Sequence, residues 1–174
     1  EGFLDDDPRA VGQSGGTLIA TGTNGTVLTS SDSTNWARAT TGVTKTLYAA
    51  TSLNGRAVGT GAGGTLLTST DLSSWQAVSS GLGADLRGVT VDTAKFVAVG
   101  TGGAILSSAD GLHWASVASG TTASLAAVTF ASQFVAVGAS GTVLTSLDGT
   151  TWLTPASGTT SSLNGVFFGL GRYS

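Results

Sequence analysis

Ser108-Ala-Asp110-Gly-Leu-His-Trp114 is one of four versions of a seven-residue stretch that recurs along the chain. The others are Ser30-Ser-Asp32-Ser-Thr-Asn-Trp36, Ser69-Thr-Asp71-Leu-Ser-Ser-Trp75 and Ser146-Leu-Asp148-Gly-Thr-Thr-Trp152. Their tryptophans are 39, 39 and 38 residues apart, and a glycine that opens a short apolar stretch upstream (Gly25, Gly64, Gly103 and Gly141) keeps the same spacing. Four copies in one register indicate a chain built of repeats of about 39 residues.

Each repeat contains four short stretches with strand character. In the last complete copy they are residues 125–130, 134–137, 142–146 and 152–156, which we call strands A, B, C and D. Clusters of Gly, Ser, Thr and Asn separate them, as expected of turns, and no stretch shows a helical period. The sequence therefore predicts an all-β fold, a β-propeller of four four-stranded repeats, because four strands per unit of about 40 residues are typical of a propeller blade.

The two ends of the chain depart from the repeat. We expect repeats at 17–42, 47–81, 86–120 and 125–158, preceded by an N-terminal segment, 1–16, with an acidic stretch. Residues 9–13 fit strand A of the first repeat badly, whereas 163–168 fit strand A well but have no strands C and D after them. We therefore expect segment 163–174 to close the ring, either by completing the first blade within one chain or by pairing between two chains in a homodimer. The alternative is a fragment of a larger propeller.

The seven-residue stretch resembles a known motif. Ser-x-Asp-x-x-x-Trp is similar to a shortened Asp-box, the motif of BNR-type and Ycf48-like propellers, whose usual form, Ser-x-Asp-x-Gly-x-x-Trp, is one residue longer. Leu163-Asn-Gly-Val-Phe-Phe-Gly-Leu-Gly-Arg172 resembles the passage from strand A to strand B in such repeats. The resemblance covers residues 18–173 and implies the propeller fold. It implies no single function, since the motif occurs in sialidases, other glycosidases, assembly factors and uncharacterised surface proteins.

The motif residues are expected to have structural roles. An Asp in a tight turn accepts hydrogen bonds from backbone N–H groups just after it, and a Trp at the end of the turn covers apolar area. Because the motif occurs in every repeat, whereas an active site should occur once per ring, we assign turn or core roles to Asp32, Trp36, Asp71, Trp75, Asp110, Trp114, Asp148 and Trp152.

The charged residues argue against catalysis. Outside the motif and the N-terminal segment, Asp85 and Asp92 are the only carboxylates, whereas glycoside hydrolysis normally needs two that flank one bond. The five arginines are scattered, at 9, 38, 56, 87 and 172, so the three clustered arginines of a sialidase have no counterpart. The single histidine, His113, occupies a position that holds Asn, Ser or Thr in the other repeats, and the chain has no cysteine. We predict no enzyme activity, no cofactor and no metal site.

Loops are the remaining candidates for function. In antiparallel blades the B–C turns share one face with the D–A connections, which are 40–46, 79–85, 119–124 and 157–162. A net charge of −3 with seven Lys and Arg argues against nucleic acid, and no apolar run is long enough to insert into a membrane. We predict a non-catalytic binding or scaffolding propeller that presents Ser/Thr/Gly-rich loops to a protein or carbohydrate partner.

The composition is typical of secreted, cell-surface or periplasmic proteins. The alternatives are a structural module or fragment of a larger secreted protein or filament, and a fragment of a sialidase-like glycosidase that lacks its catalytic residues.

Overall fold

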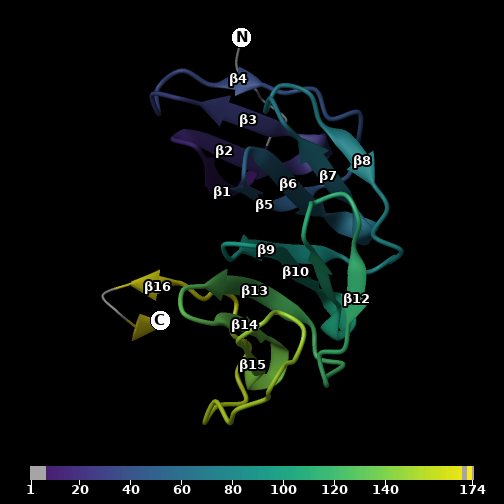
Figure 1. Ribbon diagram of the computed structural model, residues 1–174, viewed down its shortest axis with the longest axis vertical. Coiled ribbons are helices and arrows are strands. Elements are labelled where there is room, and N and C mark those ends of the chain that lie inside the picture. Colours follow the sequence, from purple (N-terminus) through teal and green to yellow (C-terminus); the bar gives the residue numbers. More distant parts are fainter. Residues whose placement is uncertain (1–6, 170–171, 174) are drawn as a thin grey trace.

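Four antiparallel sheets fan out from a common centre, and a short hairpin follows them (Figure 1). The computed structural model describes residues 7–169 and 172–173. Each sheet is one blade, and the order of its strands in space is their order in the sequence. The prediction of an all-β propeller built from four repeats is therefore confirmed.

The strands follow one plan in every blade, with a three-residue 3₁₀ turn between the second and third strands. The first blade contains β1 (Pro8–Ser14), β2 (Thr17–Gly22), η1 (Thr23–Gly25), β3 (Val27–Ser30) and β4 (Ala37–Arg38). The second contains β5 (Leu47–Leu53), β6 (Arg56–Gly61), η2 (Ala62–Gly64), β7 (Leu66–Ser69) and β8 (Gln76–Val78). The third contains β9 (Leu86–Val91), β10 (Phe96–Gly100), η3 (Thr101–Gly103), β11 (Ile105–Ser108) and β12 (Ala115–Val117). The fourth contains β13 (Leu125–Phe130), β14 (Phe134–Gly138), η4 (Ala139–Gly141) and β15 (Val143–Ser146), and the hairpin contains β16 (Phe168–Gly169) and β17 (Arg172–Tyr173). Among the described residues no helix is long and apolar enough to cross a membrane.

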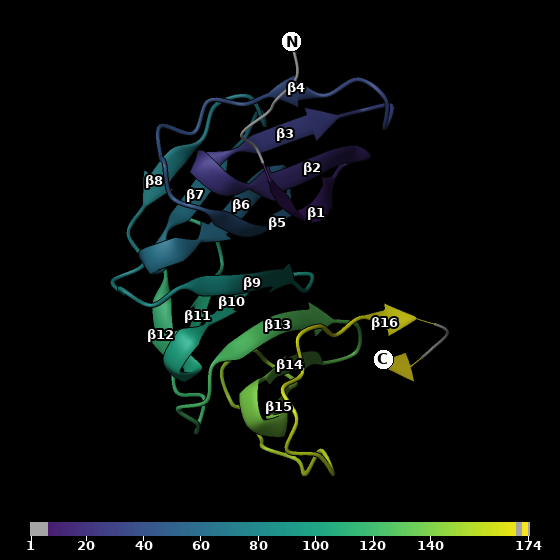
Figure 2. The ribbon, with the colours of Figure 1, turned by 180° about the vertical axis from the view of Figure 1, so that it is seen from behind.

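The hydrophobic core lies between the blades. The innermost strands β1, β5, β9 and β13 contact one another in that order along the middle of the molecule, while β4, β8 and β12 lie at the periphery (Figures 1 and 2). Three clusters of buried apolar side chains fill the three boundaries, and each draws residues from both adjoining blades. Each blade thus buries its faces only against its neighbours, as in other repeat folds.

The first blade has a complete set of strands, which corrects the expectation for residues 9–13. Pro8–Ser14 pairs with β2 in antiparallel register, so the propeller begins inside the segment 1–16 that we separated from it. Residues 1–6 of that segment, with most of its acidic stretch, lie outside the described residues. The pattern of 9–13 is a poor strand pattern, but the Gly15-Gly16 turn, with φ of +52° and +89°, holds β1 against β2.

The fourth blade lacks a regular fourth strand. We expected one over 152–156, but only an isolated bridge between Thr145 and Leu153 forms there. The proline at 155 occupies the position that Val117 fills in the third blade, where Val117 pairs with Ile105. Proline has no N–H to donate, so the ladder ends before it.

Segment 163–174 does not complete the first sheet. Its strand β16 pairs with β17, and β1 already occupies the place that we expected it to fill. Residues 170, 171 and 174 of the segment lie outside the described residues. The segment instead continues the repeat. Leu47, Leu86, Leu125 and Leu163 are equivalent residues of successive units, and they are 39, 39 and 38 residues apart. Closure between two chains stays a prediction.

The first blade has one uncovered apolar face. In the second blade, Leu47, Ala50, Ala57, Leu67 and Trp75 face the first blade and are buried. The residues 39 positions earlier on the first blade are Pro8, Val11, Leu18, Leu28 and Trp36, and none of them is buried. Val11, for example, is 67 % exposed, whereas Ala50 is 8 % exposed. A blade face of the usual apolar composition is therefore left open at this end of the stack.

Candidate binding face

The B–C turns lie against the D–A connections of their own blades. In the first blade the Gly25 N–H donates to the carbonyl of Lys45 at 2.9 Å, and the Thr41 hydroxyl donates to the carbonyl of Gly25 at 2.8 Å. In the second blade the turn ends at Gly64, whose φ is +73° and where a Cβ atom would overlap the carbonyl oxygen of Leu82. Only glycine tolerates both conditions, so the repeated glycine lets turn and connection touch.

These loops together form one side of the molecule, which we call the connection face. It consists of the B–C turns, residues 23–26, 62–65, 101–104 and 139–142, and the D–A connections, residues 40–46, 79–85, 118–124 and 156–162. The structure thus brings together the loops that the strand directions place on one face.

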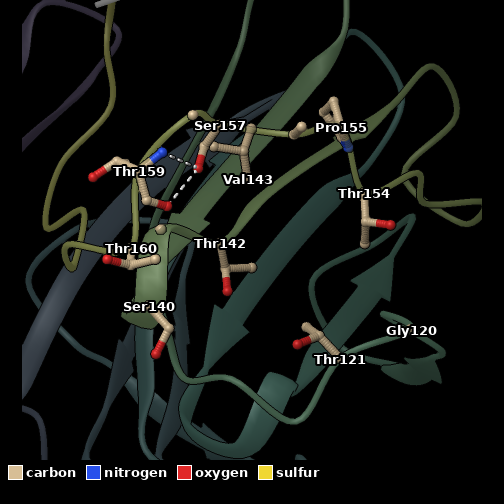
Figure 3. Close-up of a pocket in the computed structure, with 13 residues that line it drawn as sticks. Gly120, Thr121, Ser140, Thr142, Val143, Thr154, Pro155, Ser157, Thr159 and Thr160 are labelled. Carbon is tan, nitrogen blue, oxygen red and sulfur yellow. Dashed lines mark hydrogen bonds between the residues drawn. The ribbon is translucent and has the colours of Figure 1, made fainter.

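Three equivalent grooves open on the connection face. Each is bounded by the turn and connection of one blade and by the connection of the preceding blade. The grooves of the second, third and fourth blades have volumes of about 630, 900 and 780 Å³. Figure 3 shows the fourth-blade groove, in which Gly120 and Thr121 of the third blade lie across from Ser157 and Thr159. The grooves are thus products of blade stacking and recur with the repeat.

Hydroxyl and backbone groups line the grooves. In the fourth-blade groove the Ser157 hydroxyl donates to the carbonyl of Thr159 at 3.1 Å and accepts its N–H at 3.4 Å, so this side chain is engaged within its own turn. Thr154 and Thr160 on the same groove are exposed. None of the three grooves is lined by a Phe, Tyr or Trp side chain, and Lys45 is the only charged residue among their lining residues. The grooves can therefore offer hydrogen bonds but no aromatic surface.

Side chains at the ends of the D–A connections tie neighbouring blades together. Asp85, at the end of the second-blade connection and directly before β9 of the third blade, accepts a hydrogen bond from the N–H of Gly63 in the second-blade turn at 2.9 Å. Ser124 accepts the equivalent bond from Gly102 at 3.3 Å. Lys45 donates to the carbonyl of Gly63 at 3.3 Å. The connection face is thus braced across the blade boundaries.

The motif aspartates lie on the opposite face, in the turns between strands C and D. The Asp110 carboxylate accepts hydrogen bonds from the N–H groups of His113 at 2.8 Å and Leu112 at 2.9 Å, and from the Ser108 hydroxyl at 3.1 Å. The backbone bond from His113, with a second bond from its ring, holds the pKa of the Asp110 carboxyl well below its usual range. Backbone N–H groups three residues on have the same effect, lowering the pKa values of Asp32, Asp71 and Asp148.

The motif tryptophans differ in their burial. Trp75 is 5 % exposed, and its indole N–H donates to the carbonyl of Leu72 at 3.2 Å. Trp114 and Trp152 are partly buried and pack beside Phe96 and Phe134, with ring centroids 6.2 Å apart in each pair. Trp36, in the first blade, belongs to none of the three core clusters. The environment of this residue therefore depends on whether a preceding blade is present.

The remaining acidic residues and the histidine are dispersed. Asp85 precedes β9 and Asp92 follows it, so the six-residue strand, about 20 Å long, separates them. Asp92 accepts hydrogen bonds from the N–H groups of Ala94 and Lys95, both at 2.7 Å. The His113 side chain is 88 % exposed and lies 2.7 Å from Asp110. Within 7–169 and 172–173 no three His, Cys, Asp or Glu side chains gather where they could hold a metal ion.

One group of polar residues that line a common pocket was not predicted from the sequence. Arg9 and Arg87, which we treated as scattered, line the same pocket together with Tyr48 and Asn164. Their spacing could have indicated this, because the two arginines are 78 residues apart, or two repeats of 39, and so occupy equivalent positions.

Comparison with known proteins supports the fold and goes no further. No protein-family model matches the chain, and no curated protein does. Among solved structures, the chain is similar to YCF48 from Cyanidioschyzon merolae, with a TM-score of 0.70, 14 % identity and 99 % of this chain covered. It is also similar to YCF48 bound to D1 peptide, with a TM-score of 0.63, 18 % identity and 88 % covered, and to an ancestral GH74 enzyme, with a TM-score of 0.64, 13 % identity and 83 % covered.

The chain covers only 66, 53 and 23 % of those three chains, so it spans two thirds or less of each. At these identities the likeness shows the β-propeller fold, and the resemblance to the Asp-box family stays a prediction.

Proposed function

We propose that the chain is a non-catalytic binding module whose connection face holds a segment of a partner protein. The observation that carries this proposal is the set of three equivalent grooves at successive blade boundaries. A partner segment that lies across them can repeat one set of contacts, so that weak individual contacts add up to a stable complex. The expectation that the chain is secreted stays a prediction.

The chemistry of the grooves favours a polypeptide over a sugar. Hydroxyl groups and backbone amides suit the N–H and C=O groups of an extended chain, whereas the described grooves offer a sugar ring no aromatic side chain to stack on. The structural neighbour bound to D1 peptide supports the idea that this fold can bind a peptide. The carbohydrate partner that the sequence also allowed is therefore the weaker candidate.

The positions of the carboxylates support a function without catalysis. Paired carboxylates of glycosidases lie about 5–9.5 Å apart. Asp85 and Asp92 lie at opposite ends of β9, and each is engaged by backbone N–H groups. Neither can flank the same bond as the other.

Selection of peptides from a display library, followed by competition between variants, tests this function. Ala118→Trp and Ala156→Trp each add a large ring to an exposed position in a groove. Ala94→Trp is the matched control, since Ala94 is exposed in the A–B turn on the opposite face. We expect each groove variant to weaken the selected peptides at least about tenfold and the control to leave them unchanged. Peptides that bind all three variants as they bind the parent chain would contradict the proposal.

The uncovered face of the first blade favours a second candidate function, an assembly role. Leu18, Leu28 and Trp36 occupy positions that are buried in the second blade, so covering them with another blade would repeat an interface that the chain already forms three times. We propose that a second copy of the chain supplies that blade in a homodimer. Light scattering at rising protein concentration tests this candidate, and a mass that stays at 17.0 kDa would exclude it.

A further inference from the structure

A polar pocket of about 500 Å³ lies where the innermost strands begin. It is lined by Arg9 of β1, Tyr48 of β5, Arg87 of β9, Ala126 of β13 and Asn164, which precedes β16. These residues are 39, 39, 39 and 38 positions apart, so the first four occupy the second position of the innermost strand of their blades and Asn164 occupies the equivalent repeat position before β16. One repeat position from five successive units thus converges on one pocket.

The backbone singles out the same position. In each of the four blades the pairing between strands A and B shifts its register at this residue, so Arg9, Tyr48, Arg87 and Ala126 have no partner in the β-ladder. Such a β-bulge redirects a side chain away from the regular alternation of a strand, and bulges are frequent beside functional sites. Here the bulge residues are also the residues that line the pocket, so the bulge accounts for their convergence.

The side chains at this position vary, whereas the residue before them is Pro8 in the first blade and leucine in the other four units. Leu47, Leu86 and Leu125 precede the bulge in the second, third and fourth blades and are fully buried, and Leu163 holds the equivalent position in the fifth unit. The residue that follows is Tyr, Arg, Ala or Asn. The leucine keeps the strand packed in the core, and the side chain after it differs from unit to unit. The pocket therefore combines guanidinium, phenol and amide groups in one site.

Two guanidinium groups dominate the chemistry of the pocket. Among the described residues, the one carboxylate paired with Arg87 is Asp85, at 3.9 Å, a distance too long for a hydrogen bond. Asp85 is itself engaged by the Gly63 N–H, and the Arg87 side chain is 47 % exposed. Arg9 is exposed and pairs with no carboxylate of the described residues. Two planar groups with five donors each therefore face a pocket to which Tyr48 and Asn164 add a hydroxyl and an amide.

We propose that this pocket binds an oxyanion, a carboxylate or phosphate group, held by Arg9 and Arg87 and oriented by Tyr48 and Asn164. Guanidinium groups bind both oxyanions through paired, charge-assisted hydrogen bonds. The pocket is as large as the sites that hold small organic molecules, so the group is carried by a molecule larger than a free ion. The proposal is independent of the three grooves, because it depends on the strand A bulges and not on the loops between blades.

Nuclear magnetic resonance of the arginine side chains tests the proposal directly. The Nε–H signals of Arg9 and Arg87 are assigned from the variants Arg9→Lys and Arg87→Lys and are followed during titration at about 0.15 M NaCl, which screens non-specific attraction. The probes are inorganic phosphate and an acetylated, amidated tri-glutamate peptide. Arg38 and Arg56, which bond to the hydroxyls of Thr26 and Thr68 away from the pocket, are controls within the same molecule.

We expect saturable shifts of the Arg9 and Arg87 signals with at least one probe, while Arg38 and Arg56 stay in place. A response to phosphate alone identifies a phosphate site, and a response to the peptide alone identifies a carboxylate site. Arg9→Gln and Arg87→Gln should each weaken binding about fivefold or more, Tyr48→Phe should weaken it less, and Arg38→Gln, with the same change of charge, should not alter it. Asp85→Asn, which removes the neighbouring carboxylate, should tighten binding.

Parallel shifts of all four arginines, or no shift with either probe, would overturn the proposal. Equal binding by Arg38→Gln and Arg87→Gln would do the same, because the anion would then respond only to net charge. Folding of every variant is checked by circular dichroism, and because Arg9 and Arg87 are exposed we expect their replacement to leave the fold intact.

Discussion

The same substitution at two equivalent tryptophans should have very different costs. Trp75→Ala removes an indole that is 5 % exposed and donates to the carbonyl of Leu72. It belongs to the buried cluster that also contains Ile19, Val27 and Ala39 of the preceding blade. Trp36→Ala removes the equivalent side chain from the first blade, whose outer face no other blade of the described residues covers. The two changes are chemically identical, so the difference between them measures what a neighbouring blade contributes.

The magnitudes follow from burial. A buried aromatic side chain covers roughly 200 Å², worth about 5 kcal/mol at roughly 25 cal/mol per Å², and truncation of such residues to alanine costs about 3–5 kcal/mol. We expect Trp75→Ala to lower the free energy of unfolding by that amount. For the partly buried Trp36 we expect about 1 kcal/mol, near the centre of the distribution for point substitutions in general.

Urea unfolding followed by circular dichroism measures both values. The measurement is made at a chain concentration of about 1 μM and repeated at about 100 μM, because pairing between chains stabilises the folded state only at high concentration. If two copies cover the open blade, the parent chain gains stability with concentration and Trp36→Ala does not. Equal costs for the two variants at the low concentration would refute the reasoning, since the first blade would then be covered in the free chain.

Three further predictions concern the turns and the ends of the chain. Because the motif carboxylates have lowered pKa values, the stability that they contribute is present above their unfolded pKa of about 4 and is lost as the pH falls through the folded values. The free energy of unfolding in urea should therefore fall on acidification, and Asp110→Asn, which keeps a carbonyl acceptor but cannot ionise, should make that fall smaller; an unchanged profile would contradict this. Gly81→Ala, at φ +68° with open space around it, should cost about 1–2 kcal/mol, whereas Gly64→Ala, where the new Cβ overlaps the carbonyl oxygen of Leu82, should cost more in the same assay; equal costs would contradict this. If two copies pair through their ends, light scattering should give twice 17.0 kDa at high concentration, and Trp36→Glu should restore the mass of one chain.

Much of the fold could be predicted from the sequence because the information is local. The Asp and Trp of each motif and the turn glycines recur at nearly constant spacing, and each acts mainly within its own blade, as in the turn where Asp110 accepts the N–H of His113. Repetition then multiplies the signal fourfold. Strand β13, expected over residues 125–130, has those bounds in the structure.

Local patterns failed where pairing decides the structure. Residues 9–13 have a poor strand pattern, yet β1 forms because β2 offers it a complete ladder next to a Gly-Gly turn. The strand expected over 152–156 reduces to one bridge at Leu153, because a single proline cannot continue the ladder. Segment 163–174 has the pattern of strand A, but pattern alone cannot say which sheet a strand joins.

The sequence by itself determined the repeat, the strand order within a blade and the face that each loop occupies. Only the tertiary structure decided that Arg9 and Arg87 line one pocket, that three grooves open between the blades, and that one blade face remains uncovered. The reason is physical. Local hydrogen bonds and alternating burial are written into a few neighbouring residues, whereas convergence and coverage depend on how blades distant in the sequence stack against one another.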